Sequence, residues 1–302
     1  MIHGDSIEVI KKIESTSVHA IISDIPYGIG CDDWDVLHNN TNSALGGTSK
    51  AQNEAGALFK RRGKPLNGWS DADKKIPLEY QQWCDSWASD WFRVLKPGGS
   101  CFIFAGRRFA HRCIIALEDA GFTFKDMLAW EKNTAPHRAQ RLSVIFERRN
   151  DNFNEDQWKG WRVANLRPVF EPILWFQKPY KVGGTIADNV LENQVGAWNE
   201  QALKDYSLFD RQLSAANILK VKVDSSDSGK HIAQKPIRLM ELLVSLVTIE
   251  GQTVLDPFAG SGTVCVAAKR LNRNYIGIDM DWHCVEIAHQ RLEESYQTNL
   301  FS

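Results

Sequence analysis

Two stretches of the sequence combine residue types that bind cofactors or take part in catalysis. The first, TVLDPFAGSGTV at residues 253–264, predicts a strand that ends in Asp256, then a glycine-rich turn and the start of a helix. Gly260 and Gly262 would let the backbone pass close to a ligand, because glycine has no Cβ and tolerates positive φ. The second, SDIPYG at residues 23–28, places an acid, a proline and an aromatic residue where an apolar run ends. By itself, this second stretch is either a turn after a core strand or the lip of an active site.

The glycine-rich stretch discriminates among nucleotide cofactors. A phosphate loop has a lysine before its Ser or Thr, whereas Gly262 precedes Thr263 here, which disfavours a nucleoside triphosphate. A dinucleotide fingerprint has a third glycine where Cys265 stands, which weakens NAD and a nicotinamide-dependent oxidoreductase. The next predicted strand ends in Asp279, where the carboxylate could form a hydrogen bond with a ribose. Trp282 follows closely, and its ring could lie against an adenine ring. We therefore expect S-adenosylmethionine as the cofactor. The alternative is that the glycine-rich turn serves only to pack the strand against the helix and binds no ligand.

The rest of the chain predicts alternating strands and helices, which favours a mostly parallel sheet with helices on both faces. Apolar runs predict strands at residues 18–23, 100–105, 123–130, 169–177, 253–256 and 275–279. Helical periodicity predicts helices at residues 6–13, 78–95, 107–120, 236–249, 262–271 and 282–292. Trp83, Trp87 and Trp91 share one face of the second helix, which indicates a buried face rather than a base-stacking platform. Residues 36–77, 148–168 and 180–230 lack such periodicity and are expected to be loops or insertions.

Composition describes a soluble globular protein. The chain has 302 residues, of which 43% are hydrophobic and 24% charged, with a formal net charge of −1. Because neither a signal peptide nor an apolar stretch of membrane-spanning length is found, we expect a cytoplasmic protein without membrane contact. The six cysteines show no metal-ligand spacing, which predicts reduced thiols and no metal site. Nucleic-acid binding would depend on local cation clusters, found at residues 60–64 and 132–149.

Together, DIPYG at residues 24–28 and DPFAGSGT at residues 256–263 resemble the two signatures of the DNA methyltransferases that modify adenine N6 or cytosine N4. The catalytic signature precedes the cofactor loop, as in the β-class of that family. Further matches are GDS at residues 4–6, VLKPGGSCFIF at 94–104, FEPILWFQK at 170–178 and HIAQKP at 231–236. The resemblance implies a circularly permuted, Rossmann-like methyltransferase fold with a mostly parallel, seven-stranded sheet and helices on both faces. The start of the chain would then supply the third strand of the cofactor half of the sheet.

By this resemblance, residues 24–27 hold the amine that receives the methyl group. Asp24 and the backbone carbonyl of Ile25 would accept its two N–H groups, Pro26 would shape the turn, and Tyr27 would stack on a base rotated out of the duplex. The family usually has proline at the position of Ile25, so packing must replace the fixed φ of proline.

The cofactor-binding residues implied by the resemblance lie in the glycine loop, in the next strand and helix, and in two other matched stretches. They are Asp5, Lys235, Pro236, Asp256, Phe258, Gly260, Gly262, Thr263, Asp279 and Trp282. Two of them have structural alternatives: Asp5 as a helix N-cap, and Pro236 as the residue that opens a helix.

The resemblance also implies a double-stranded DNA substrate. Phosphate contacts are expected from Lys60, Arg61, Arg62, Lys64, Lys132, Arg138 and Arg141. We expect a catalytic domain formed by residues 1–35, 78–179 and 231–302, the last of these being the cofactor half. Residues 36–77 are expected to be an inserted loop near the catalytic residues, and residues 180–230 a target-recognition region.

The aspartate at position 24 favours adenine N6 as the acceptor, so the expected activity is site-specific DNA adenine-N6 methylation. Cytosine N4, RNA and a protein amide are the alternative acceptors. An inactive DNA-binding relative of the fold is the alternative from another class. The resemblance also allows a homodimer and a cognate restriction endonuclease as partners.

Overall fold

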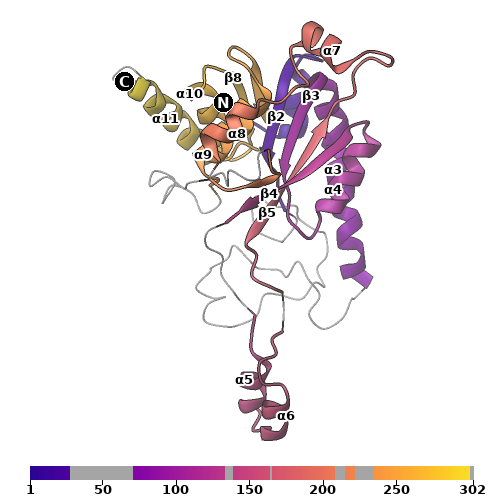
Figure 1. Cartoon of the computed structure of the whole chain (residues 1–302), viewed down its shortest axis with the longest axis vertical. Helices are drawn as coiled ribbons and strands as arrows, with labels where there is room; N and C mark the ends of the chain where they lie inside the picture. The colour runs from indigo at the N-terminus through magenta and orange to yellow at the C-terminus, as the bar shows by residue number, and fades with distance from the viewer. Residues whose placement is uncertain (28–70, 133–138, 164, 208–214, 222–233, 300–302) are drawn as a thin grey trace.

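The computed structural model describes residues 1–27, 71–132, 139–163, 165–207, 215–221 and 234–299. A sheet lies at its centre, and the strands of the described part follow the order β1-β8-β7-β2-β3-β5-β4-β6 (Figure 1). β5 is antiparallel to both of its neighbours, and the other neighbouring pairs are parallel. The expected mostly parallel, Rossmann-like fold class is therefore confirmed.

All six strands predicted from apolar runs are present. They are β2 (Val18–Asp24), β3 (Leu95–Phe104), β4 (Thr123–Glu131), β5 (Phe170–Gln177), β7 (Thr253–Asp256) and β8 (Asn274–Asp279). The N-terminal strand β1 (Ile2–His3) pairs in parallel with β8, as the permuted order predicted. The edge strand β6 (Ile218–Leu219) pairs with β4, so the sheet has eight strands among the described residues, where seven were expected.

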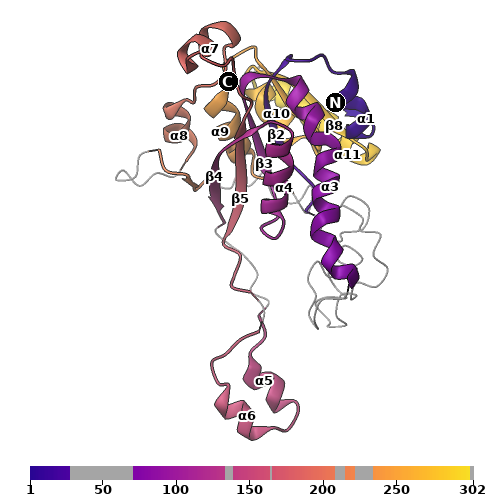
Figure 2. The same ribbon diagram turned by 90° about the vertical axis from the view of Figure 1, so that its right-hand side faces the viewer.

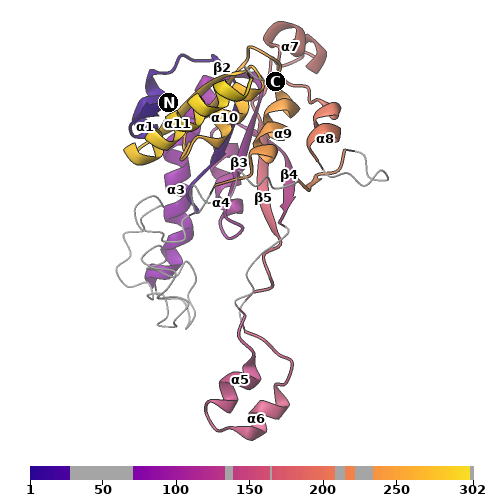
Figure 3. The same cartoon turned by 90° about the vertical axis from the view of Figure 1, so that its left-hand side faces the viewer.

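Helices cover both faces of the sheet, because alternate residues of a strand point to opposite sides. In β2, Ala20 and Ile22 face one apolar core and Ile21 faces the other. The first core includes residues of α8 (Glu200–Tyr206), α9 (Ile237–Val247) and α10 (Thr263–Arg270). The second includes residues of α3 (Asp71–Val94) and α4 (Ala110–Asp119). Figures 2 and 3 show these two groups of helices on either side of the strands.

The two ends of the chain complete this arrangement. α1 (Ser6–Val9) continues as a short 3₁₀ helix (Ile10–Lys12), in place of the single helix expected to residue 13. Both contact α3, whereas α11 (Trp282–Asn299) packs on α10 and β8. Within the part of the chain that the structure describes, no helix is long and apolar enough to cross a bilayer.

The structure corrects several boundaries in the polar segments. α3 begins at Asp71 and contains Pro77, so the insertion expected to extend to residue 77 is helical at its end. β3 begins at Leu95, directly after α3, and not at residue 100 as predicted. Helices α5 (Leu142–Glu147), α6 (Asn152–Gln157) and α7 (Ile186–Asn193) were not predicted, and neither was α8.

These short helices escaped prediction because they have no long apolar period. Side-chain caps contribute to the starts of α6, α7 and α8. Asp151 accepts a hydrogen bond from Asn154 N at the start of α6, and Asn199 accepts one from Gln201 N at the start of α8. Thr185 forms a reciprocal capping box with Asp188 at the start of α7. Such caps satisfy backbone N–H groups that a helix leaves unpaired.

Candidate active site

The carboxyl ends of β2 and β7 bring the two sequence signatures together. β2 ends in Asp24 and pairs with β7, which ends in Asp256. Ser23 Oγ donates a hydrogen bond to Asp256 Oδ1 at 2.8 Å. Both signatures therefore lie at one edge of the sheet, where ligands bind in open parallel sheets.

The predicted catalytic stretch leaves the sheet at Asp24 and is anchored by its neighbours. Ile25 is 2% exposed and belongs to the core covered by α3 and α4, so packing holds its side chain. Tyr80 OH donates a hydrogen bond to Pro26 O at 3.0 Å, and Tyr27 OH donates one to Asp24 Oδ1 at 2.7 Å. The Asp24 side chain remains 28% exposed, which leaves its carboxylate within reach of a ligand.

Asp24 belongs to a cluster of charged side chains from several elements. Lys235, just before α9, forms an ion pair with Asp24, and its Nζ lies 3.1 Å from Glu171 Oε1. Glu171, in β5, also contacts the Tyr27 hydroxyl and forms an ion pair with Lys132, just after β4. We call these five residues, Asp24, Tyr27, Lys132, Glu171 and Lys235, the Asp24–Glu171 cluster.

Burial and opposite charge compete within this cluster. Burial raises the pKa of Asp24, and the Lys235 ammonium opposes that rise. Burial also acts to raise the pKa of Glu171, but the ammonium groups of Lys235 and Lys132 bring it down to about 2. Desolvation acts to lower the pKa of Lys235, and the carboxylates of Asp24 and Glu171 outweigh it and raise that pKa. The cluster thus balances two carboxylates with two ammonium groups.

The contacts of two residues in the cluster were not predicted from the sequence. Lys235 was expected beside the cofactor, and the structure places its ammonium against Asp24 and Glu171. Glu171 was not predicted as a site residue. The available signal was a carboxylate at the start of the apolar strand FEPILWF. In the folded protein, Glu171 is 7% exposed. Pro236 occupies the N-cap position of α9, in keeping with its structural alternative.

The glycine loop after β7 is tied to the end of β8. Gly260 N donates a hydrogen bond to Asp279 Oδ2 at 2.7 Å. Gly260 has φ +50°, and a Cβ added there would meet no atom within 4 Å, so open space lies beside the loop. Gly262 has φ +76°, and an added Cβ would lie 2.7 Å from the Cβ of Ala288. Gly260 therefore borders the open space, whereas Gly262 allows α10 to approach α11.

Other predicted cofactor residues are engaged by the protein itself. The Phe258 ring packs against Trp83 and Trp91 of α3, with ring centroids 5.6 and 6.1 Å apart. Thr263 Oγ1 accepts a hydrogen bond from Arg291 Nη1 at 3.0 Å, and the same nitrogen donates to Ser261 O at 2.6 Å. Sequence reasoning missed Arg291, which holds the glycine loop from α11. The predicted buried tryptophan face of α3 is confirmed for Trp87 and Trp91, which are at most 1% exposed, whereas Trp83 is partly buried.

Three predicted cofactor residues lie at the carboxyl ends of β1, β7 and β8. Asp5 Oδ1 accepts a hydrogen bond from Ile7 N at 2.9 Å and so caps α1. Burial raises the pKa of Asp256 to about 7. Trp282 is 57% exposed and meets the His3 ring edge-on, with centroids 5.3 Å apart. With the open space at Gly260 and the Asp279 carboxylate, these residues fit an adenosine-bearing cofactor such as S-adenosylmethionine.

Of the described residues predicted to contact DNA, Lys132 lies at the catalytic edge, whereas Arg141 lies at the start of α5, on an extension that leads away from the sheet (Figures 2 and 3). Lys132 is 33% exposed and belongs to the Asp24–Glu171 cluster, and Arg141 is the N-cap residue of α5. The α5–α6 pair leaves the sheet between the end of β4 and the start of β5, which is also the edge that carries Asp24 (Figures 2 and 3). Lys60, Arg61, Arg62, Lys64 and Arg138 lie outside the described residues.

The segment expected to recognise the target, residues 180–230, lies at two places in the fold. In α7, Asn189 Nδ2 donates a hydrogen bond to Pro97 O near the amino end of β3, which puts this helix at the opposite edge from Asp24 (Figure 1). β6 pairs with Ala129 and Trp130 near the carboxyl end of β4. β6 therefore lies nearer the catalytic edge than α7 does.

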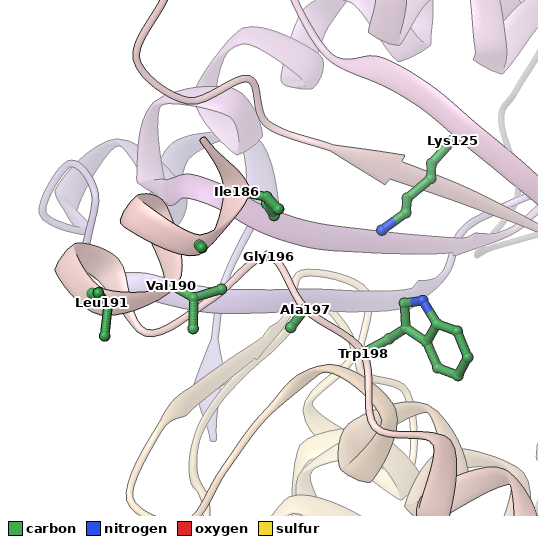
Figure 4. Close-up of a pocket in the computed structure, with 8 residues that line it drawn as sticks. Lys125, Ile186, Val190, Leu191, Gly196, Ala197 and Trp198 are labelled. Atoms are coloured by element: carbon green, nitrogen blue, oxygen red, sulfur yellow. The ribbon is translucent and has the colours of Figure 1, made fainter. Parts of the chain in front are cut away.

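A cavity of about 630 Å³ lies beside α7 (Figure 4). Its lining is mostly apolar and includes Ile186, Val190, Leu191 and Trp198, with Lys125 from β4. None of the predicted catalytic or cofactor residues lines it. The large cavity is therefore separate from the candidate active site.

Comparisons with known sequences agree with this geometry. Residues 18–290 match the model of a family described as DNA methylase. The chain is similar to the Type II methyltransferase M.HindIII of Haemophilus influenzae, with 63% identity across 96% of this chain and 94% of that protein. It is also similar to the Type II methyltransferase M2.DpnII of Streptococcus pneumoniae, with 27% identity across 99% of this chain and 91% of that protein.

Solved structures share the fold. The PvuII DNA methyltransferase, described as cytosine-N4-specific, aligns with a TM-score of 0.58 and 16% identity, covering 98% of this chain and 89% of its own. TTHA0409 of Thermus thermophilus is described as a putative DNA modification methylase complexed with S-adenosyl-L-methionine. It aligns with a TM-score of 0.57 and 18% identity, covering 97% of this chain and 94% of its own. Because the family match spans nearly the whole catalytic fold and M.HindIII is so similar, the chain belongs to the DNA methylases that act on N6 or N4 amines.

Proposed function

We propose that the protein transfers a methyl group from S-adenosylmethionine to the exocyclic N6 amine of an adenine in double-stranded DNA. The observation that carries the proposal is the hydrogen bond between Ser23 and Asp256, since it joins the strand of the catalytic Asp24 to the strand that leads into the glycine loop. The methyl acceptor and the cofactor would then lie side by side. Family membership and the Type II methyltransferases among the relatives support DNA as the substrate.

Two groups at the end of β2 would hold the amine. Its nitrogen is a weak nucleophile because its lone pair is delocalised into the ring. Acceptance of both N–H groups by Asp24 and the Ile25 carbonyl favours rehybridisation of that nitrogen, and Tyr27 offers a ring on which the base stacks. Bound S-adenosylmethionine supplies a methyl group activated by its sulfonium. The methylated nitrogen would then lose a proton, and the Asp24 carboxylate would accept it.

The target base would have to leave the duplex to reach this edge of the sheet. Rotation of the base costs a few kcal/mol, which stacking partly offsets. We propose that phosphate contacts by the predicted cationic residues hold the duplex during this step. Residues 180–230 are proposed to contribute target recognition, with β6 as a described element that pairs with β4 of the catalytic half of the sheet.

Adenine N6 is the preferred acceptor because the first residue of the catalytic signature is an aspartate, Asp24. Cytosine N4 is the second candidate, because the matched family includes methylases of N6 and of N4 amines. The PvuII enzyme, described as cytosine-N4-specific, is 16% identical, so its likeness concerns the fold alone.

Nucleoside analysis tests the proposed function. The purified protein is incubated with methyl-labelled S-adenosylmethionine and genomic DNA amplified in vitro, which contains no N6-methyladenine or N4-methylcytosine. The DNA is then digested to nucleosides and separated by chromatography. We expect label in N6-methyldeoxyadenosine. Label in N4-methyldeoxycytidine would support the second candidate, and cofactor binding without a product would indicate an inactive relative.

Sequencing of modified bases in the same DNA would give the recognition sequence. We propose that methylation at that sequence protects DNA from a cognate restriction endonuclease, as the Type II designation of the relatives suggests. Digestion of methylated and unmethylated DNA with an endonuclease of that specificity would test the protection.

A further inference from the structure

Glu171 contacts the Tyr27 hydroxyl and the Lys235 ammonium, the two groups that also contact Asp24. It lies in β5, on the far side of β3 from β2, and is 7% exposed. Its Oε1 accepts from the Tyr27 hydroxyl and lies 3.1 Å from Lys235 Nζ, and its Oε2 pairs with Lys132. One carboxylate thus contacts three members of the Asp24–Glu171 cluster.

Asp24 and Glu171 compete for the same hydrogen-bond donors. The Tyr27 hydroxyl carries one hydrogen, yet its oxygen lies within reach of both carboxylates. The Lys235 ammonium contacts Asp24 Oδ2, Glu171 Oε1 and the Tyr27 oxygen. Donors that lie between two acceptors can pass from one to the other by small side-chain rotations.

This competition matters for the proposed chemistry. With Tyr27 on Oδ1 and Lys235 on Oδ2, both oxygens of Asp24 already accept hydrogen bonds from the protein. The amine nitrogen gains positive charge as it takes the methyl group, and an ammonium on the same carboxylate would repel it. Asp24 therefore works best when Lys235 and Tyr27 are held elsewhere.

We propose that Glu171 is a positioning residue that takes over the Tyr27 hydroxyl and the Lys235 ammonium when Asp24 accepts the target amine. This inference rests on the proposed function and deepens it. Lys132 pairs with the other oxygen of Glu171, which keeps Glu171 ionised and oriented toward Tyr27 and Lys235. No backbone movement is needed, because both donors already lie within hydrogen-bond reach of Glu171.

The substitution Glu171→Gln tests this role. It preserves the shape of the side chain and an acceptor for Tyr27, but removes the charge that draws Lys235 away from Asp24. We expect the maximal single-turnover rate of adenine methylation to fall on the order of 10- to 100-fold. The dissociation constant of S-adenosylmethionine and the DNA concentration for half-maximal rate should change less than about threefold, because the effect lies in the transition state.

A pH profile separates positioning from a structural role. Among the described residues, the charged or titratable groups against Lys235 are Asp24, Tyr27 and Glu171, and the Phe104 ring lies 5.3 Å from Nζ. The Glu171 charge raises the pKa of Lys235, so its removal lets Lys235 lose its proton at lower pH. Loss of that proton frees Asp24. The Glu171→Gln rate should therefore rise toward alkaline pH more steeply than the wild-type rate.

Glu131→Gln is the matched control. Glu131 ends β4 at the same edge, is 40% exposed and pairs with Lys220 at 3.0 Å, outside the cluster. Its substitution should leave the methylation rate and the pH profile as in the wild type. If the Glu171→Gln rate equals that of this control, or falls without the alkaline rise, the inference is wrong.

A second variant keeps the test decisive if Glu171→Gln alone folds poorly. Glu171→Gln combined with Lys235→Gln removes one buried charge of each sign and is compared with Lys235→Gln at saturating cofactor. If Glu171 acts through Lys235, its substitution should cost less than about threefold in this background. A loss as large as that of the single variant would overturn the inference. Absence of methyladenine with the wild-type protein would instead overturn the proposed function itself.

Discussion

Gly260 N donates a hydrogen bond to Asp279 Oδ2 at 2.7 Å, which ties the glycine loop after β7 to the end of β8. The predicted ribose-binding carboxylate thus also holds the loop that would approach the cofactor. A second hydrogen bond, from Asp281 N to Asp279 Oδ1 at 2.9 Å, orients the same carboxylate from the start of α11. Loop and carboxylate are therefore organised before a ligand arrives, which reduces the entropy lost on binding.

Gly260→Ala should weaken cofactor binding. Gly260 has φ +50° and open space beside it, so a methyl group there costs about 1 kcal/mol of backbone strain and intrudes on the proposed ligand. Gly251→Ala is the control, because Gly251 has φ +78° and equally open surroundings just before β7. We expect similar small losses of stability, but a cofactor dissociation constant raised about tenfold or more in Gly260→Ala alone. Equal calorimetric affinities for the two variants would contradict this placement.

Asp24→Ala should abolish methyl transfer while the protein still binds S-adenosylmethionine. The variant lacks the acceptor for the amine, and Lys235 keeps Glu171 as a partner, with 3.1 Å between Nζ and Oε1. We expect the rate to fall on the order of 1,000-fold, as for the loss of a preorganised polar group at a reacting centre. Rate and affinity are measured on the same preparation. Near-normal turnover would rule out Asp24 as the amine acceptor.

Ile25→Ala should destabilise the protein and slow methylation. Ile25 is 2% exposed in the core, so removal of its buried carbons should cost about 2 to 4 kcal/mol of unfolding free energy. The loosened backbone would also misplace the carbonyl that accepts the second N–H. Ile249→Ala, at a position 58% exposed, should cost little. Urea denaturation of both variants is the measurement, and an unchanged midpoint for Ile25→Ala would show that packing does not hold this residue.

Asp256→Asn should change the pH dependence of stability. Burial raises the native pKa of Asp256 to about 7, so the native state keeps a proton that the unfolded state loses near pH 4. Wild-type stability therefore falls as pH rises from about 4 to 7, whereas asparagine has no charge to bury. Between pH 5 and 8, the variant should gain about 3 kcal/mol relative to the wild type. Parallel stability curves for both proteins, measured without cofactor, would contradict a buried carboxyl with this pKa.

DNA affinity should fall steeply with salt concentration, because phosphate contacts release counterions. Replacement of Lys60, Arg61, Arg62 and Lys64 by alanine should reduce the slope of log affinity against log salt by about 3 to 4 if all four contact phosphates. Fluorescence anisotropy with a labelled duplex, measured at several salt concentrations, gives both slopes. An unchanged slope would remove these residues from the DNA interface.

Much of the fold could be predicted from the sequence, because apolar periodicity is a local property. It placed the six longer strands and the main helices, and the order of the two signatures predicted the pairing of β1 with β8. It failed at α5, α6, α7 and α8, whose short spans carry no sustained period. Side-chain caps contribute to the starts of α6, α7 and α8.

The sequence by itself determined the strands and helices of the main fold and the two signatures that carry the family resemblance, because each depends on residues that are neighbours in the chain. Only the tertiary structure decided which distant side chains meet. Glu171 contacts Tyr27 across 144 positions of the chain, and Lys235 contacts Asp24 across 211. Such contacts depend on strand order and on the direction of each side chain at the sheet edge. Local patterns do not encode either property.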